Sequence, residues 1–435
     1  MAQARSWQRP WHDHLPHHPS TISRSAAHHE PTALPTPLTP DSLADLQTMV
    51  RELHATSSPW IPSGLGTRMH WGAALQPSPL ISLRQCNTVL DHAIDDLTIS
   101  VQAGLSLTDL QAVLAEQNQW LPIDWPWGSS HQPTTAGTVG GLVARGLTGG
   151  LRHRHLGVRD QIIGIGLIRS DGVEAHAGGR VVKNVAGYDL MRLLCGSWGS
   201  LALISELTLR VQPIRPARAL LNLKGDLDAL EAWRAEVVAS TLTLELLNWQ
   251  QDPIQGLGIQ AGIASVSDAA VTDQLNRLES LAESHRLKAE RHPWDGPLPP
   301  PAARPTDAGD QGSQQWLLRI SLPPSQAQAL FSSRETQALR DWHWLLAAGA
   351  GCGDAWSDQA STRAQVQALR RRVEALGGRL SVLIQPASQP PEETLPAWTD
   401  APSRPLIEAV KRQFDPRLQL SRGRLPGVAK PVTIA

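Results

Sequence analysis

The segment that decides the fold runs from Lys183 to Pro213 and reads KNVAGYDLMRLLCGSWGSLALISELTLRVQP. It predicts a glycine turn, a short apolar helix, a second glycine turn at Gly196 and Gly199, and a buried strand that ends at a proline. Upstream lies TTAGTVGGLVARGLTGG (Thr134–Gly150), which contains six glycines. Because glycine permits positive φ and close backbone approach, two such segments in one domain predict a main chain laid against a large ligand.

A third glycine segment, PSGLGT at 62–67, completes a set with residues 133–146 and 196–206. Backbone amides in tight glycine turns can donate several hydrogen bonds to a dinucleotide diphosphate without side-chain bulk. None of the three segments is the GxGxxG sequence that opens a helix after the first strand of a Rossmann unit. A dinucleotide site in this chain would therefore be built on another fold.

The composition argues against several classes of protein. The 435 residues allow two or three domains, and the formal net charge of −1 gives no sign of a nucleic-acid binder. Apolar runs are interrupted by Gly, Pro or charge well before they reach membrane-spanning length. Three scattered cysteines, Cys86, Cys195 and Cys352, favour a reducing compartment. They are also too few for an iron–sulfur cluster, which four cysteines usually hold.

Hydrophobic patterning divides the chain into three parts. Residues 1–38 are rich in His, Pro, Ser and Thr, and we expect a disordered tail without a signal peptide. Residues 39–213 form one domain with subdomains at about 39–118 and 119–213, in which Thr39 caps the first helix and Asp171-Gly172 turns a hairpin. Residues 214–435 alternate short strands with helices, one of them over 325–340, around a Pro-rich loop at 293–315. This order predicts an α+β fold.

These segments resemble the PCMH-type FAD-binding domain shared by vanillyl-alcohol oxidase and its relatives. Residues 160–211 are similar to that pattern, and within the family they resemble the FAD-binding E subunits of bacterial glycolate oxidases (glycolate dehydrogenases). PSGLGTRMHWG (62–72) and TTAGTVGGLVARG (134–146) resemble the first and second flavin segments, and KRQFDPRLQLSRGRLPG (411–427) resembles the closing signature. The resemblance implies a two-subdomain FAD-binding domain followed by a smaller α+β cap domain.

The resemblance also implies which residues contact the cofactor. One group would surround the diphosphate, a second would run beside the diphosphate and flavin ring, and a third would order the surroundings of the ring and the adenine side. The residues concerned are Pro62, Ser63, Gly64, Leu65, Gly66, Thr67, Thr135, Gly137, Thr138, Gly140, Gly141, Asn184, Gly187, Tyr188, Ile204 and Glu206. Tyr188 is explained equally well as a core residue. The context of His70 does not match the sites of covalent flavin attachment in the wider family, so we expect non-covalent FAD.

Residues for substrate chemistry are harder to find. Related flavin dehydrogenases of 2-hydroxy acids carry an HxGDGNxH metal motif, and nothing in residues 214–435 resembles it. We therefore assign no metal site and no catalytic residue. Arg379, Arg422 or Arg424 could meet a substrate carboxylate, because arginine can pair with an oxyanion through two hydrogen bonds.

The resemblance implies an FAD-binding subunit of a glycolate dehydrogenase complex, which oxidises glycolate to glyoxylate and passes electrons through flavin to an iron–sulfur partner. A second FAD subunit would carry the substrate site. Two other functions stay open. One is a stand-alone FAD-dependent 2-hydroxy-acid dehydrogenase, and the other is a flavin-binding scaffold subunit without catalysis. The expected location is cytoplasmic, with membrane association only through partner subunits.

Overall fold

The computed structural model describes residues 37–126, 136–179, 189–295, 315–357, 359, 361–386 and 394–431. All of them belong to one unit that begins at Pro35. Several expectations lie outside the described residues: nearly all of the N-terminal tail, most of the 293–315 loop, and the site residues Thr135, Asn184, Gly187 and Tyr188. Leu38, which the sequence analysis assigned to the tail, already donates a backbone hydrogen bond to the Leu80 carbonyl (2.8 Å).

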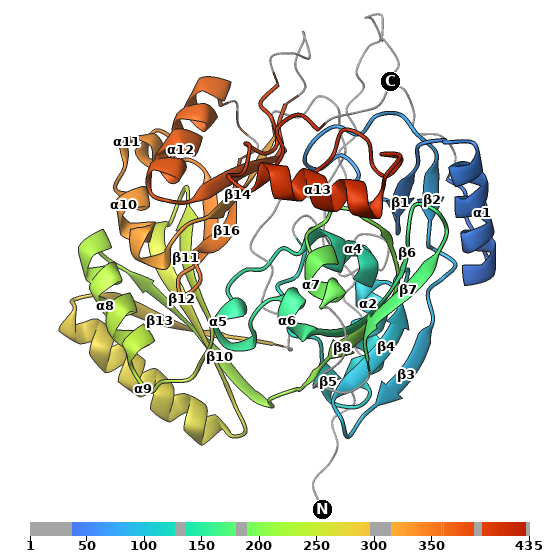
Figure 1. The fold of residues 1–435 in the computed structure, drawn as a ribbon. Coiled ribbons are helices and arrows are strands. Elements are labelled where there is room, and N and C mark those ends of the chain that lie inside the picture. The colour runs from blue at the N-terminus through green and yellow to red at the C-terminus, as the bar shows by residue number, and fades with distance from the viewer. Residues whose placement is uncertain are drawn as a thin grey trace, which may run out of the picture. The chain divides into compact units, whose positions relative to one another are not determined.

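The first half of the chain forms the part that contains the glycine segments (Figure 1). Its elements are α1 (Leu43–Ala55), β1 (Ile61–Ser63), β2 (Leu80–Ser82), β3 (Val89–Ala93), β4 (Thr98–Gln102), α2 (Leu107–Ala115), β5 (Gln119–Trp120), α4 (Val139–Arg145), α5 (Arg152–His155), α6 (Val158–Gln161), β6 (Ile162–Ile168), β7 (Glu174–Gly178), α7 (Leu190–Leu194), β8 (Leu203–Arg210) and β9 (Gln212–Pro213). The predicted cap of the first helix was wrong. Ser42 caps α1 by accepting a hydrogen bond from Asp45 N, because the backbone at Leu38 is still paired beside β2.

A five-stranded antiparallel sheet, in the order β3-β4-β8-β6-β7, organises this half. The predicted hairpin is confirmed: β6 and β7 pair across a turn in which Gly172 has a φ of +77° and Asp171 Oδ1 accepts from Val173 N (3.1 Å). The predicted strand that ends near Pro213 is also confirmed as β8, which lies between β4 and β6. The two expected subdomains thus share one sheet, since β3 and β4 precede residue 118.

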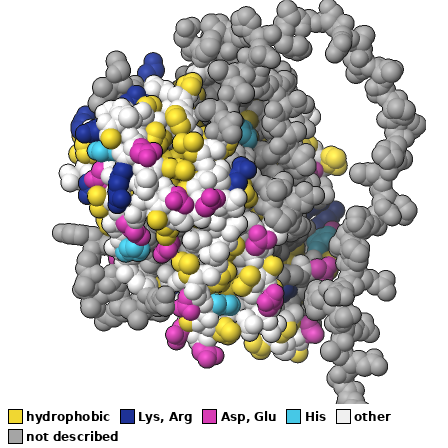
Figure 2. Space-filling view, turned by 90° about the vertical axis from the view of Figure 1, so that its right-hand side faces the viewer, with side chains coloured by type: hydrophobic (Ala, Val, Ile, Leu, Met, Phe, Trp, Pro, Cys, Tyr) yellow, Lys and Arg dark blue, Asp and Glu magenta, His cyan; other side chains and the backbone are white. Residues whose placement is uncertain are grey.

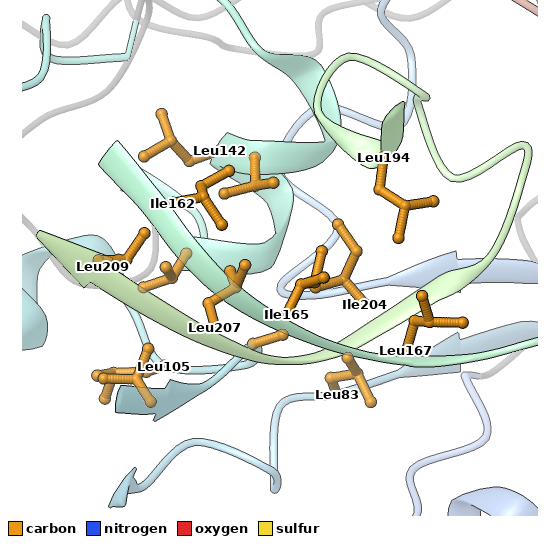
Figure 3. Packing of buried hydrophobic residues seen from close by; sticks show 14 of the residues in the cluster. Leu83, Leu105, Leu142, Ile162, Ile165, Leu167, Leu194, Ile204, Leu207 and Leu209 are labelled. Atoms are coloured by element: carbon orange, nitrogen blue, oxygen red, sulfur yellow. The ribbon is translucent and has the colours of Figure 1, made fainter. Parts of the chain in front are cut away.

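One face of this sheet packs into a hydrophobic core. Figure 3 shows Ile165 and Leu167 of β6 and Leu207 of β8 beneath Leu142 of α4 and Leu194 of α7. All five side chains are buried. At about 25 cal/mol for each Å² of apolar surface removed from water, such side chains stabilise the fold by about 1.5–3 kcal/mol each. This packing places the ends of α4 and β8 near each other.

The second half contains an eight-stranded sheet, in the order β13-β10-β12-β11-β15-β16-β14-β17, in which every pair is antiparallel. Its elements are β10 (Ala217–Lys224), α8 (Leu227–Ala239), β11 (Leu244–Asp252), β12 (Gly256–Ser265), α9 (Asp268–Ser284), β13 (Lys288–Pro293), β14 (Trp316–Ser321), η1 (Pro324–Gln326), α10 (Ala327–Phe331), α11 (Arg334–Gln337), β15 (His343–Ala347), β16 (Cys352–Ser357), α12 (Arg363–Ala375) and β17 (Arg379–Ile384). The predicted single helix over 325–340 was wrong. It is divided because Ser333 caps a new helix by accepting from Thr336 N (3.2 Å).

The helices of this half cover one face of its sheet. Trp233 of α8, Leu275 of α9 and Val366 of α12 share a core with Ile259 of β12 and Leu318 of β14. Side chains on the other face contact the first half instead. Examples are the clusters of Trp71 with Leu317 and Trp356, and of Leu151 with Leu246. Together the two halves confirm the predicted α+β class.

The chain then returns to the first half. Helix α13 (Arg404–Phe414) was not predicted from the sequence, and the segment after it runs beside β1. Trp60 N donates to Gln419 O (2.9 Å) and Ser421 N to Trp60 O (3.0 Å). The last described segment is therefore part of the glycine-bearing half, although it is the furthest from it in sequence.

Candidate functional site

The first glycine segment follows β1 and forms one wall of the site. The Gly64 carbonyl accepts a hydrogen bond from Ser82 Oγ of β2 (2.8 Å), and Gly66 has a φ of +73°. Within the described part of the chain, the backbone amides of Gly64, Leu65, Gly66 and Thr67 have no hydrogen-bond acceptor. The amides of this turn are therefore available to a ligand beside it.

The second glycine segment opens α4. Thr138 caps the helix, because its Oγ1 accepts a hydrogen bond from Gly141 N (3.1 Å). The Gly140 amide donates to Ala103 O (2.9 Å), and a Cβ at Gly140 would lie 2.8 Å from the Ala103 Cβ. Glycine is thus required for α4 to start against the end of β4. The first amides of α4 are bonded within the protein, so anion binding falls mainly to the first segment.

The third glycine segment joins α7 to β8 and contacts the other two. Trp198 N donates to Ala144 O at the end of α4 (2.8 Å). Gly199 has a φ of +72°, and a Cβ at this position would lie 2.9 Å from Pro62 Cγ. The three segments, which are separated by about 70 and 60 residues in the sequence, are therefore in mutual contact.

All three segments border one open cavity, whose empty space is about 800 Å³ when the part open to solvent is included. The sequence-predicted residues that line the cavity are Pro62, Ser63, Gly64, Leu65, Gly66, Thr67, Gly137, Thr138, Gly140, Gly141 and Ile204. Thr135, Asn184, Gly187 and Tyr188 lie outside the described residues. The structure thus brings together the described members of all three predicted groups except Glu206.

Glu206 lies on the opposite face of β8. Its carboxylate is 3.9 Å from His176 Nε2, beside Gly166 and Thr208. An irregular register places Gly166 opposite Glu206 but Leu167 opposite Ile204, so Ser205 is an extra residue in β8. Such a bulge turns residues on its two sides toward opposite faces. Ile204 therefore faces the cavity and Glu206 does not.

Several lining residues were not predicted from the sequence as cofactor contacts. They are Arg68, Met69, Leu83, Ala103, Ala144, Arg145, Trp198, Gly199, Ala202, Leu203 and Arg424. Arg68 and Met69 directly continue the first glycine segment, so their position in the sequence could have predicted that they line the site. Arg145 ends α4, and Arg424 lies within the closing signature, where the sequence analysis considered it only for a substrate carboxylate.

The described lining of the cavity is positively charged. It contains Arg68, Arg145 and Arg424 and no aspartate or glutamate. Arg68 and Arg145 lie over the Trp71 ring, at 5.4 and 5.5 Å from its centroid, and Arg424 lies 5.7 Å from the Trp198 centroid. Burial lowers the pKa of Arg424 to about 10, which still leaves it charged at neutral pH.

This charge is local to the cavity. Residues 37–126 contain nine acidic residues and three arginines, a formal balance of 3 − 9 = −6. Figure 2, which views the side of α1 and β3, shows acidic side chains scattered over that surface. A cavity lined by three arginines is suited to a bound anion.

FAD fits the residues that are present. Successive free amides and three guanidinium groups match a diphosphate, and apolar lining from Leu83, Ala103, Leu203 and Ile204 can cover a ring system. His70 is exposed and does not line the cavity.

A second cavity of about 540 Å³ lies between the two halves, and Arg145 lines both. Arg319 Nη1 donates to Asp354 Oδ1 (3.1 Å), and Nη2 donates to the Thr148 carbonyl. Asp124 accepts from Gly149 N (2.6 Å). Burial alone would lower the pKa of Arg319, but the carboxylate of Asp354 raises it. Arg319 is therefore already engaged by the protein.

The three arginines proposed for a substrate carboxylate lie in different places. Arg379 is exposed at the start of β17, and Arg422 lines a groove beside α13, whereas Arg424 reaches the main cavity. Among the described residues there is no group of three or more His, Cys, Asp or Glu side chains that could hold a metal ion. No helix in the described ranges is long and apolar enough to cross a membrane.

Comparison with known proteins agrees with this geometry. Residues 37–178 match a family described as FAD binding domain. The chain is 31% identical to glycolate oxidase subunit GlcE of Escherichia coli, over 49% of this chain and 56% of that protein. It is 29% identical to glycolate oxidase subunit GlcD of Bacillus subtilis, over 50% and 46%. It thus spans about half the length of these curated relatives.

The fold also has solved counterparts. The chain is similar to alkyldihydroxyacetonephosphate synthase, with a TM-score of 0.64 at 14% identity, over 89% of this chain and 76% of that one. At this identity the similarity concerns the fold alone. It covers the second half as well as the glycine-bearing half.

Proposed function

We propose that this chain binds FAD, the cofactor of the FAD binding domain family that residues 37–178 match. The chain is the FAD-binding subunit of an oxidoreductase that acts on a 2-hydroxy acid, with glycolate as the substrate of the whole enzyme. The observation that carries this proposal is the cationic cavity where the three glycine segments meet. The names of the two glycolate oxidase relatives support the substrate class.

The roles of the lining residues follow from their chemistry. The free amides from Gly64 to Thr67 bind the diphosphate, and Arg424, which is bonded to the continuation of the same segment, supplies positive charge. Ile204 and Leu203 exclude water from one end of the cavity. FAD, when bound, supplies the redox chemistry, and it is held without a covalent bond to the protein.

The proposed enzyme has further subunits. A second FAD subunit provides the groups that remove the substrate protons, and an iron–sulfur subunit takes the electrons. Two observations support this division of labour. The described cysteines are free and dispersed, and Arg319 beside the second cavity is already paired with Asp354. Oxidation of glycolate to glyoxylate releases two electrons and two protons, so an acceptor and a proton-accepting group are both required.

A spectrum of the purified chain tests the proposal. We expect the absorption of one FAD per chain, and we expect acid denaturation to release all of it into the supernatant. Glycolate added anaerobically should bleach the flavin only when the partner subunits are present. Bleaching of the isolated chain would indicate a stand-alone dehydrogenase, and no bleaching in the complete complex would indicate a scaffold. A reconstituted chain that takes up no FAD would overturn the proposal.

A further inference from the structure

The segment from Lys411 to Arg424 contacts two walls of the FAD cavity. One wall is the first glycine segment with its continuation to Ala73, and the other is the turn at Gly199 and Ser200. The segment comes from the end of α13 and the loop that follows it (Figure 1). It is separated from these walls by more than 200 residues of sequence, so its contacts must be explained by the folded structure.

Lys411 holds the turn on one side. Its side chain is buried, and Nζ donates to the carbonyl oxygens of Ser200 (2.7 Å) and Leu420 (3.0 Å) and to Asp415 Oδ2 (2.6 Å). Burial lowers the pKa of Lys411, and the Asp415 carboxylate opposes that change. All three ammonium hydrogens thus have acceptors, so the Lys411 side chain is fully hydrogen-bonded where it lies.

Asp415 completes the hydrogen-bond network around Lys411. It is fully buried, and its carboxylate also accepts from the amides of Gln419 (2.9 Å) and Leu420 (2.7 Å). The next residue, Ser421, donates from Oγ to Gly199 O (2.9 Å). Two adjacent carbonyls of the cavity turn, at Gly199 and Ser200, are therefore held by one short segment.

Arg424 holds the other wall. Nη2 donates to the carbonyl oxygens of Met69 (2.9 Å), Trp71 (2.7 Å) and Ala73 (3.0 Å). In the described part of the chain no carboxylate lies within ion-pair distance of Arg424. Its charge is balanced by carbonyl dipoles and faces the cavity, so it both fixes the exit of the first glycine segment and favours an anion there.

We propose that Lys411 and Arg424 are positioning residues for FAD, which hold the two glycine walls in place from a common segment. The inference rests on FAD as the ligand of this cavity; it adds a positioning role to Arg424 and brings in Lys411, which does not line the cavity. A buried ion pair is by itself weak evidence for stability. Here, however, Lys411 of this pair also donates a hydrogen bond to Ser200, in the turn that forms one cavity wall.

The test compares three variants of the full chain: Lys411→Met, Ser421→Ala and the control Arg412→Met. Arg412 is the next residue of α13, but its side chain is mostly exposed and 3.9 Å from Glu408. The dissociation constant for FAD is measured well below the melting temperature of the apo variant, together with the visible circular dichroism of bound flavin. We expect Lys411→Met to weaken FAD binding about ten- to a hundredfold, as for the loss of a charged hydrogen bond, and to change the dichroism. Arg412→Met should change neither.

The outcomes separate this inference from the proposed function. If the wild-type chain binds no FAD, both fail. If it binds FAD and folded Lys411→Met retains its affinity and dichroism, the positioning role alone is overturned. Should Lys411→Met not fold, Ser421→Ala decides. It removes only the hydroxyl bonded to Gly199, and an unchanged affinity and dichroism in that variant would also overturn the role.

Discussion

The Gly64→Val variant is expected to weaken FAD binding about ten- to a hundredfold, because overpacking costs about 1–3 kcal/mol and about 1.4 kcal/mol is a factor of ten in affinity. A Cβ at Gly64 would overlap the side chain of Thr138, which also lines the cavity. Thr138 cannot yield freely, because it caps α4. Titration of the apo protein with FAD, followed by quenching of flavin fluorescence, measures the loss.

The control for this prediction is Gly179→Val. A Cβ at Gly179 would have no atom of the described residues within 4 Å, and this residue does not line the FAD cavity as described. Overpacking at Gly64 should cost about 1–3 kcal/mol of unfolding free energy, so urea unfolding of both variants shows whether the fold survives. Wild-type FAD affinity in folded Gly64→Val would contradict the assignment of the first glycine segment to the cofactor.

Local sequence signals predicted much of the fold. The Asp171-Gly172 turn and the apolar faces of α1 and α8 depend on neighbours within a few residues, so their patterns can be recognised. Strands β3 and β13 were not predicted, because they lie at sheet edges, where no residue of either strand is fully buried, and β13 is also largely polar. Helix α13 was missed because its buried residue is a charged one, Lys411.

The site was predictable to the extent that it is made of glycine. A requirement for close backbone approach is visible in the sequence at Gly64, Gly140 and Gly199, and the structure brings these residues to one cavity. The spacing of residues along the sequence does not indicate that Arg424 lines the same cavity, because this depends on the return of the chain after α13. The bulge at Ser205 likewise has no glycine or proline to mark it, and it decides which way Glu206 faces.

The Arg319→Met variant is expected to destabilise the chain by about 3–5 kcal/mol, because it leaves the largely buried Asp354 carboxylate without its cation. The variant also removes the bond from Arg319 to the Thr148 carbonyl, which joins β14 of the second half to the loop after α4. The double variant Arg319→Met with Asp354→Leu should recover most of this loss, since apolar pairs of similar volume often replace a buried ion pair without penalty. Urea unfolding at neutral pH gives the free energies.

The matched control for this pair is Arg277→Met, which removes an ion pair with Asp273 on α9 whose two side chains are 63% and 60% exposed. Pairs of that kind contribute about 0.2–1 kcal/mol or less, because water screens the charges. A loss at Arg319 no larger than at Arg277 would show that neither the ion pair within the second sheet nor the bond to Thr148 contributes appreciably to stability. A large loss, recovered in the double variant, would show that the cost comes from an isolated carboxylate. The Thr148 bond, which neither variant retains, would then contribute little, and the contact between the halves would depend mainly on apolar packing such as that of Trp71 with Leu317 and Trp356.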